Sequence, residues 1–186
     1  MNDHRRHFLR SGAAALAAGT AIGRWAAAIA SPAASPLVTI ENFSPAGKSL
    51  GTSQVPKIVK SDAEWRAQLS PLAFQVARQE GTETAFSGEY DKNHADGIYH
   101  CICCDTPLFD SKTKFDSGTG WPSFYRAISR YNAAQSSDTK FGMVREAIAC
   151  RRCDAHLGHV FDDGPQPTGL RYCMNSVSLH FTPRSA

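Results

Sequence analysis

The chain has 186 residues, of which 42% are hydrophobic and 20% are charged, so bulk disorder is excluded and one domain with a hydrophobic core is expected. The formal net charge of +3 comes entirely from residues 1–30, which hold four arginines against one aspartate. Basic and acidic residues balance in the rest of the chain. Charge therefore predicts no nucleic-acid or membrane-surface partner.

The N-terminus is typical of a targeting segment. The run Arg5 to Arg10 resembles a twin-arginine export signal, an Ala/Gly-rich stretch follows, and Ala28-Ile29-Ala30 offers a cleavage site. The apolar stretch is too short to span a bilayer. We expect residues 1–30 to be a signal peptide and the mature protein to be periplasmic or otherwise extracytoplasmic, with no membrane partner after signal removal. A dispensable basic helix is the alternative.

The next segments predict a linker and two helices. Residues 31–60 are rich in Ser, Pro and Gly without a sustained period, which indicates a linker or loose arm. Ser61 to Glu64 has capping-box spacing, and Ser70-Pro71 starts a second helix that ends before Gly81. Leu72, Phe74 and Val76 of that helix are expected to face the core.

From Thr82 onward, short apolar or aromatic runs alternate with Gly, Pro, Asn and Asp turns. This pattern predicts antiparallel strands joined by turns, without alternating strands and helices. The predicted class is mostly β, with small helices in front. The candidate strands cover residues 98–100, 141–149, 159–161, 170–172 and 176–181.

The chain carries two C-x-x-C pairs separated by 45 residues, Cys101 with Cys104 and Cys150 with Cys153. Two such pairs are typical of a zinc site with four cysteine ligands. A mixed centre made by Cys150, Cys153 and the two histidines that follow is excluded, because ligands at every third residue would spread over about 13 Å of helix. We expect one structural Zn²⁺ per chain. Disulfides, favoured in an oxidising compartment, are the alternative.

Cys173 is left over as a candidate nucleophile. Arg171 and Asn175 lie two residues on either side of it, so all three side chains would share one face of a strand. A Gly/Pro-rich turn could bring His156 and His159 back against that face. A thiol with convergent His, Asn and Arg is a nucleophilic arrangement, although a small buried apolar residue is the alternative.

Five motifs together resemble the B-type methionine sulfoxide reductases over residues 61–183. They are His100-Cys101-x-x-Cys104, Gly120-Trp121-Pro122-Ser123-Phe124, the stretch from Cys150 to Phe161, Asp163-Gly164-Pro165, and Arg171-Tyr172-Cys173-x-Asn175-Ser176. The resemblance implies two antiparallel β-sheets with short N-terminal helices, stapled by the zinc site. It also implies reduction of the R epimer of methionine sulfoxide, in proteins or free.

The resemblance assigns roles to the candidate residues. Cys173 would attack the sulfoxide sulfur and become a sulfenic acid. Trp121 and Phe161 would bind the substrate, while His156, His159 and Asn175 would orient it and help to protonate its oxygen. Arg171 would favour the thiolate. An external thiol donor, thioredoxin-like or other, would restore Cys173.

Two positions depart from the family pattern. Thr119 stands where many members have a resolving cysteine, and Cys103 is an extra cysteine inside the first C-x-x-C pair. Cys103 could be inert, a substitute zinc ligand or a resolver. Two other function classes remain open: a zinc-stapled β binding module that uses Trp121 as a contact surface, and a Cys–His acyl-transfer hydrolase. Loss of one oxygen from an oxidised-methionine peptide would separate all three.

Overall fold

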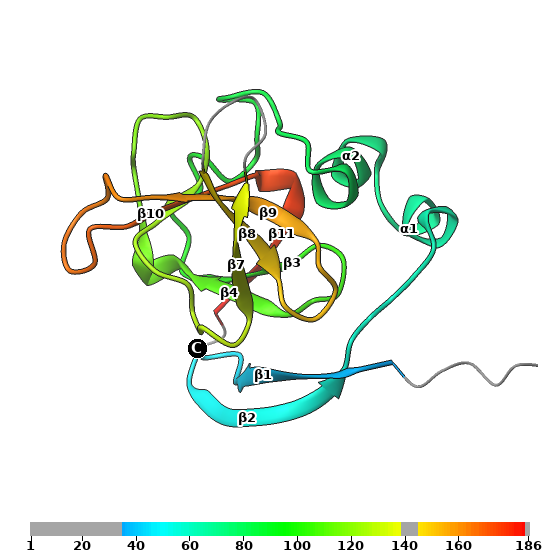
Figure 1. Ribbon diagram of the computed structural model, residues 1–186. Coiled ribbons are helices and arrows are strands. Elements are labelled where there is room, and N and C mark those ends of the chain that lie inside the picture. The colour runs from blue at the N-terminus through cyan, green and yellow to red at the C-terminus, as the bar shows by residue number, and fades with distance from the viewer. Residues whose placement is uncertain (1–34, 139–144, 185–186) are drawn as a thin grey trace, which may run out of the picture. The chain divides into compact units, whose positions relative to one another are not determined.

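The computed structural model describes residues 35–138 and 145–184, so the predicted signal peptide and residues 141–144 of one strand candidate lie outside the described residues. The elements, drawn in Figure 1, are β1 (Leu37–Phe43), β2 (Ser49–Pro56), α1 (Asp62–Gln68), α2 (Pro71–Gln79), β3 (Gly97–Cys101), β4 (Pro107–Asp110), the 3-10 turn η1 (Ser111–Thr113), β5 (Lys114–Phe115), β6 (Ser123–Phe124), β7 (Ala133–Asp138), β8 (Arg145–Cys150), β9 (His156–Phe161), β10 (Arg171–Met174), the 3-10 turn η3 (Ser176–Ser178) and β11 (Leu179–Pro183).

The strands form three antiparallel sheets. A six-stranded sheet has the order β5-β6-β10-β9-β8-β7, a three-stranded sheet has the order β11-β3-β4, and β1 pairs with β2 alone. The first two sheets lie within the region predicted to be the domain and confirm its mostly β class with two short helices in front. The strand predicted over residues 176–181 is wrong in its first half, because residues 176–178 form η3.

Both helices begin where the sequence predicts. Ser61 and Glu64 form a complete capping box on α1, and Ser70 caps α2 with Pro71 at the first position. Val76 and Phe74 are buried as expected, but Leu72 is 44% exposed, contrary to prediction. Leu72 lies in the first turn of α2, whose buried face is instead set by Ala73, Phe74, Val76 and Ala77. No helix in the described ranges is both long and apolar enough to cross a membrane.

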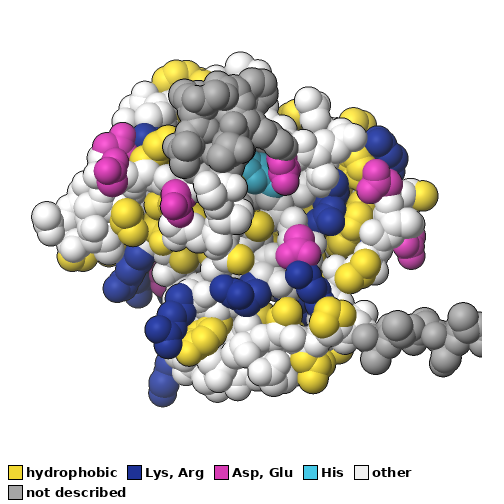
Figure 2. Space-filling model, viewed as in Figure 1, with side chains coloured by type: hydrophobic (Ala, Val, Ile, Leu, Met, Phe, Trp, Pro, Cys, Tyr) yellow, Lys and Arg dark blue, Asp and Glu magenta, His cyan; other side chains and the backbone are white. Residues whose placement is uncertain are grey.

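The β1–β2 hairpin lies within the segment interpreted as a linker or loose arm. Asn132 holds it to the rest of the fold: Asn132 Oδ1 accepts from the Glu41 N–H at 2.7 Å, and Asn132 Nδ2 donates to the Glu41 carbonyl at 2.9 Å. Lys57 also pairs with Asp154 at 2.8 Å. In Figure 2, Lys and Arg side chains gather beside the hairpin. These partners are distant in sequence, which explains why local composition indicated no strand.

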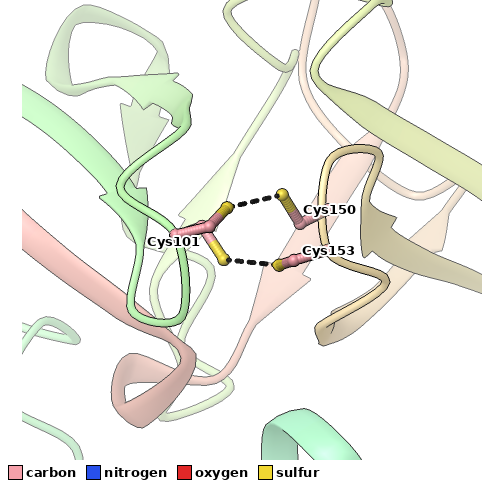
Figure 3. A group of neighbouring side chains, drawn as sticks. Cys101, Cys150 and Cys153 are labelled. Atoms are coloured by element: carbon pink, nitrogen blue, oxygen red, sulfur yellow. Dashed lines mark hydrogen bonds between the residues drawn. The ribbon is translucent and has the colours of Figure 1, made fainter. Parts of the chain in front are cut away.

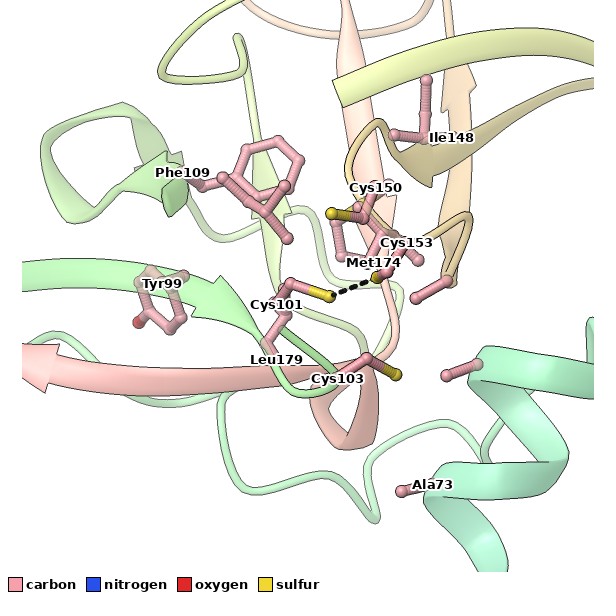
Figure 4. Close-up of a cluster of buried hydrophobic side chains, with 14 of the residues drawn as sticks. Ala73, Tyr99, Cys101, Cys103, Phe109, Ile148, Cys150, Cys153, Met174 and Leu179 are labelled. Atoms are coloured by element: carbon pink, nitrogen blue, oxygen red, sulfur yellow. Dashed lines mark hydrogen bonds between the residues drawn. The ribbon is translucent and has the colours of Figure 1, made fainter. Parts of the chain in front are cut away.

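One buried cluster connects the helices with the two larger sheets. The ring of Phe124 stacks on Phe109 at 4.5 Å and meets Tyr99 edge-on at 5.0 Å. Figure 4 shows that this aromatic cluster continues through Met174 into the cysteines of the two C-x-x-C pairs. Three of the four candidate metal cysteines, Cys101, Cys150 and Cys153, are therefore part of the core, and Cys104 packs against it.

Candidate active site and metal centre

The two C-x-x-C pairs are built by the same local structure. The first begins at the end of β3 and the second at the end of β8, so each sheet contributes one pair. In both, the residue after the second cysteine adopts a left-handed backbone, with φ of 60° at Asp105 and 55° at Asp154. The N–H of that residue donates to the carbonyl of the first cysteine at 2.9 Å in each case. Aspartate tolerates this conformation better than most residues.

The four thiols converge on one point. The Sγ atoms of Cys101, Cys104, Cys150 and Cys153 all lie within 4.8 Å of one another. Two cross-pair distances, drawn in Figure 3, are 3.6 Å for Cys101 to Cys153 and 3.5 Å for Cys104 to Cys150. These distances are too long for disulfides and close to the roughly 3.8 Å edge of a tetrahedron with metal–sulfur bonds of about 2.3 Å. The donor set can hold a metal ion that joins the two sheets.

Cys103 is not one of the four converging cysteines, although its thiol hydrogen-bonds with those of Cys101 and Cys153. It is 4% exposed, belongs to the hydrophobic cluster and points toward α2 in Figure 4. Its backbone carbonyl accepts from Gln68 Nε2 at 2.7 Å. The structure therefore places Cys103 in the core beside the metal cysteines.

Cys173 lies in the middle of the six-stranded sheet, paired with His159 on β9 and Ser123 on β6. It lines a cavity of about 130 Å³, whose other walls are Thr82, Trp121, Gly158, His159, Phe161, Met174 and Asn175. Gly158 is required there, because a Cβ atom at this position would lie 2.1 Å from the Cys173 carbonyl oxygen. The close approach of β9 to β10 brings His159 next to the thiol.

Burial raises the pKa of the Cys173 thiol above its usual value. A hydrogen bond with Thr119, whose Oγ1 lies 3.9 Å from Sγ, and the positive charge of Arg171 both act in the opposite direction. Ser117 links the Thr119 hydroxyl to that of Ser123 through contacts of 2.8 and 2.7 Å. A chain of hydroxyl groups therefore lies on one side of the thiol.

Arg171 lies beside the cavity and is held by two interactions. Its guanidinium forms a two-pronged ion pair with Asp163, with both N–O distances at 2.8 Å, and stacks on the Phe161 ring at 4.4 Å. The ion pair raises the pKa of Arg171 and lowers that of Asp163. The sequence motif Asp163-Gly164-Pro165 did not predict a site role for Asp163, because its ion pair with Arg171 forms only in the folded chain.

His156 and Asn175, the remaining candidates, do not both line the cavity. His156 is buried outside the cavity lining and meets the His159 ring edge-on, with centroids 5.2 Å apart. Asn175 lines the cavity, but its amide oxygen accepts from the Glu83 N–H and its Nδ2 donates to the Leu157 carbonyl, both at 3.0 Å. The structure thus brings His159, Asn175, Trp121, Phe161 and Cys173 to one cavity. Outside its lining, His156 contacts the His159 ring and Arg171 interacts with the Cys173 thiol.

Sequence reasoning missed Glu83. Its carboxylate is 2% exposed and accepts from the N–H groups of Ser176 and Val177 at 2.7 and 3.0 Å. Its backbone carbonyl accepts from Trp121 Nε1 at 3.2 Å. Glu83 therefore connects the indole of Trp121 to the turn after Cys173. Its partners in the turn after Cys173 lie at least 92 residues further along the chain, so no local motif reveals these contacts.

Comparison with known proteins agrees with this geometry. The SelR domain matches residues 69–183. The peptide methionine sulfoxide reductase MsrB of Pseudomonas entomophila (strain L48) is 60% identical over 128 residues, which are 69% of this chain and 98% of that protein. The MsrB of Thiobacillus denitrificans (strain ATCC 25259 / T1) is 58% identical over 125 residues, 67% of this chain and 95% of that protein. The chain therefore belongs to the MsrB family of peptide methionine sulfoxide reductases.

Proposed function

We propose that this protein reduces the R epimer of methionine sulfoxide in oxidised polypeptides, with Cys173 as the nucleophile. The observation that carries the proposal is the cavity that places Cys173 beside His159 and Trp121 in a chain of this family. A binding module would not need a thiol at the cavity wall. The cavity of about 130 Å³ fits the end of one side chain rather than a larger ligand.

Each residue of the cavity has a separate role in the proposed reaction. Cys173 Sγ attacks the sulfoxide sulfur as a thiolate, the sulfoxide oxygen passes to Sγ, and methionine leaves while Cys173 becomes a sulfenic acid. His159, paired with Cys173 across β9 and β10, supplies the proton that the oxygen needs. Trp121 and Phe161 enclose the apolar part of the substrate. Asn175 and His156 hold the wall and the His159 ring in place.

An external thiol restores the enzyme. Thr119 is the side chain that lies 3.9 Å from Cys173 Sγ, and a threonine cannot form a disulfide. Cys103 is a core residue beside the metal cysteines. A donor thiol therefore condenses with the sulfenic acid, releasing water and leaving a mixed disulfide, and a second thiol then releases Cys173. A thioredoxin-like protein or another dithiol can serve as this donor.

The four cysteines of the cluster, Cys101, Cys104, Cys150 and Cys153, would hold one structural Zn²⁺ per chain. Its thiolate donors and their spacing fit a closed tetrahedral zinc site, which leaves no position for substrate. When bound, the ion supplies folding free energy by joining the two sheets. Elemental analysis of the purified full chain should give one zinc per protein.

The protein acts outside the cytoplasm after export through the twin-arginine route. The arginine pair, the short apolar run and the small-residue cleavage motif in residues 1–30 support this location. Replacing Arg5 and Arg6 by lysines should retain the protein in the cytoplasm. Cell fractionation would show this, and normal export of the double variant would contradict it.

The decisive activity assay compares epimers. Peptides carrying separate R and S sulfoxides are incubated with the protein and a small dithiol, and the loss of one oxygen is followed by mass spectrometry. Turnover of the R epimer alone supports the proposal. No loss of oxygen from either epimer would leave the binding module or the hydrolase as the better account.

A further inference from the structure

Phe86 lies between α2 and β3 and is 66% exposed. Five large apolar side chains of the described residues are exposed, and Phe86 is the aromatic member of that group. The others are Leu37, Leu50, Val59 and Leu72. A single exposed apolar side chain needs no explanation. Its backbone does, because φ is 64°, in the left-handed region that bulky L residues rarely adopt.

The backbone of Gly120 holds Phe86 in this conformation. The Phe86 N–H donates to the Gly120 carbonyl at 2.8 Å. A Cβ atom at Gly120 would lie 2.7 Å from Cγ and Cδ2 of the Phe86 ring, and Gly120 itself has a φ of 86°. The ring therefore rests directly on the peptide backbone of Gly120, where only glycine fits.

This contact lies next to the cavity that contains Cys173. Gly120 precedes Trp121, whose indole lines the cavity and donates to the Glu83 carbonyl at 3.2 Å. Thr82, at the start of the same segment, also lines the cavity. Residues 82–86 thus run beside residues 120–121, joined by two hydrogen bonds, and the exposed Phe86 ring lies on the residue that precedes Trp121.

We propose that Phe86 binds an apolar side chain adjacent to the oxidised methionine in a polypeptide substrate. The inference rests on the proposed function and adds a determinant of substrate choice to it. The cavity of about 130 Å³ has room for the sulfoxide side chain, so neighbouring residues of the substrate must lie outside its mouth. An exposed ring held next to Trp121 can bury such a neighbouring apolar side chain, and its backbone, already fixed on Gly120, loses no freedom on binding. Free methionine sulfoxide has no neighbouring side chain to make this contact.

The test compares substrates with and without that neighbour. Phe86→Asn removes the ring but keeps a residue that tolerates positive φ. Phe86→Tyr keeps the ring, and Leu50→Asn, at another exposed apolar position, is the matched control. For each variant, kcat and KM are measured on a peptide with leucine beside the R sulfoxide, on a peptide with aspartate there, and on free methionine-R-sulfoxide.

The expected result is about a tenfold fall in kcat/KM for Phe86→Asn on the leucine peptide, mainly through KM, with the other two substrates within about twofold. Phe86→Tyr and Leu50→Asn should behave like the unmodified protein. An equal fall on free methionine-R-sulfoxide would show that Phe86 only positions Trp121 and would overturn the proposal, as would an unchanged leucine peptide. Failure of the proposed function is recognised separately, because the unmodified protein would then reduce none of the three substrates.

Discussion

The cysteine cluster and Cys173 use the same side chain in two different structural settings. The cluster is built from two similar turns at strand ends, each closed by hydrogen bonds within six residues, and its four thiols converge on one point. Cys173 lies in the middle of a strand, and its surroundings come from β6, β9 and the segments that contain Thr82 and Thr119. Each half of the cysteine cluster is thus encoded locally, whereas the surroundings of Cys173 are assembled from distant parts of the chain.

The largest effect is expected from removing the sulfur atom of Cys173, the proposed nucleophile. Cys173→Ser should lower kcat/KM on an R-sulfoxide peptide by at least about a thousandfold, because oxygen lacks the nucleophilicity and redox range of sulfur. Metal content and the thermal midpoint should stay as in the unmodified protein. Turnover within tenfold of normal would show that another thiol performs the reaction.

Removing a metal cysteine should act on the fold instead. Cys101→Ser is expected to cost several kcal/mol of folding free energy, comparable with the whole stability of a domain, because it opens the tetrahedral donor set. Thermal unfolding and elemental analysis measure this effect. The matched control is Cys103→Ala, which should keep one metal ion per chain. Full metal loss in the control, with none in Cys101→Ser, would reverse the assignment of the two cysteines.

Trp121→Ala should lower kcat/KM by about a hundredfold through loss of substrate positioning. The indole is fixed by its hydrogen bond to the Glu83 carbonyl, so its loss leaves one cavity wall open. Metal content should not change. If the unfolding midpoint fell as far as it does for a metal-cysteine variant, Trp121 would be part of the scaffold rather than of the substrate site.

The smallest expected effect concerns ionisation of the thiol. Because burial raises the pKa of Cys173, its alkylation rate should keep rising with pH beyond the usual cysteine range. Arg171 opposes that shift, so Arg171→Gln should move the pH profile further upward and slow alkylation at neutral pH by roughly threefold. Arg126→Gln is the charge-matched control, because Arg126 is exposed, stacks on the Tyr125 ring and does not line the cavity. A downward movement of the profile would contradict the electrostatic role of Arg171.

Patterns that are local in sequence predicted most of the fold. The capping box at Ser61, the proline start of α2 and the C-x-x-C turns depend on residues within one turn of each other, and the structure has all three. The β1–β2 hairpin was not predicted, because Asn132 and Asp154 hold it from far along the chain.

The candidate site follows the same rule. Cys173, His159 and Phe161 were identified by motifs on the two strands that carry them. Glu83, Asp163 and Phe86 were not, since their importance comes from contacts with Trp121, Arg171 and Gly120 that only the folded chain creates. The sequence likewise did not distinguish His156 from His159 as the proposed proton donor, because only the folded chain places His159 at the cavity wall.

Single turnover tests most directly the claim that Cys173 is the reactive thiol and the other cysteines are structural. The protein receives one equivalent of R-sulfoxide peptide without reductant, then a sulfenic-selective probe, and its peptides are mapped. We expect one methionine to be released and the probe to be found on Cys173, with no internal disulfide. Thr119→Cys, as a positive control, should instead give a disulfide between Cys173 and the introduced thiol, because position 119 already lies beside Sγ. A stoichiometric Cys103–Cys173 disulfide in the unmodified protein would contradict the account and make Cys103 the resolving cysteine.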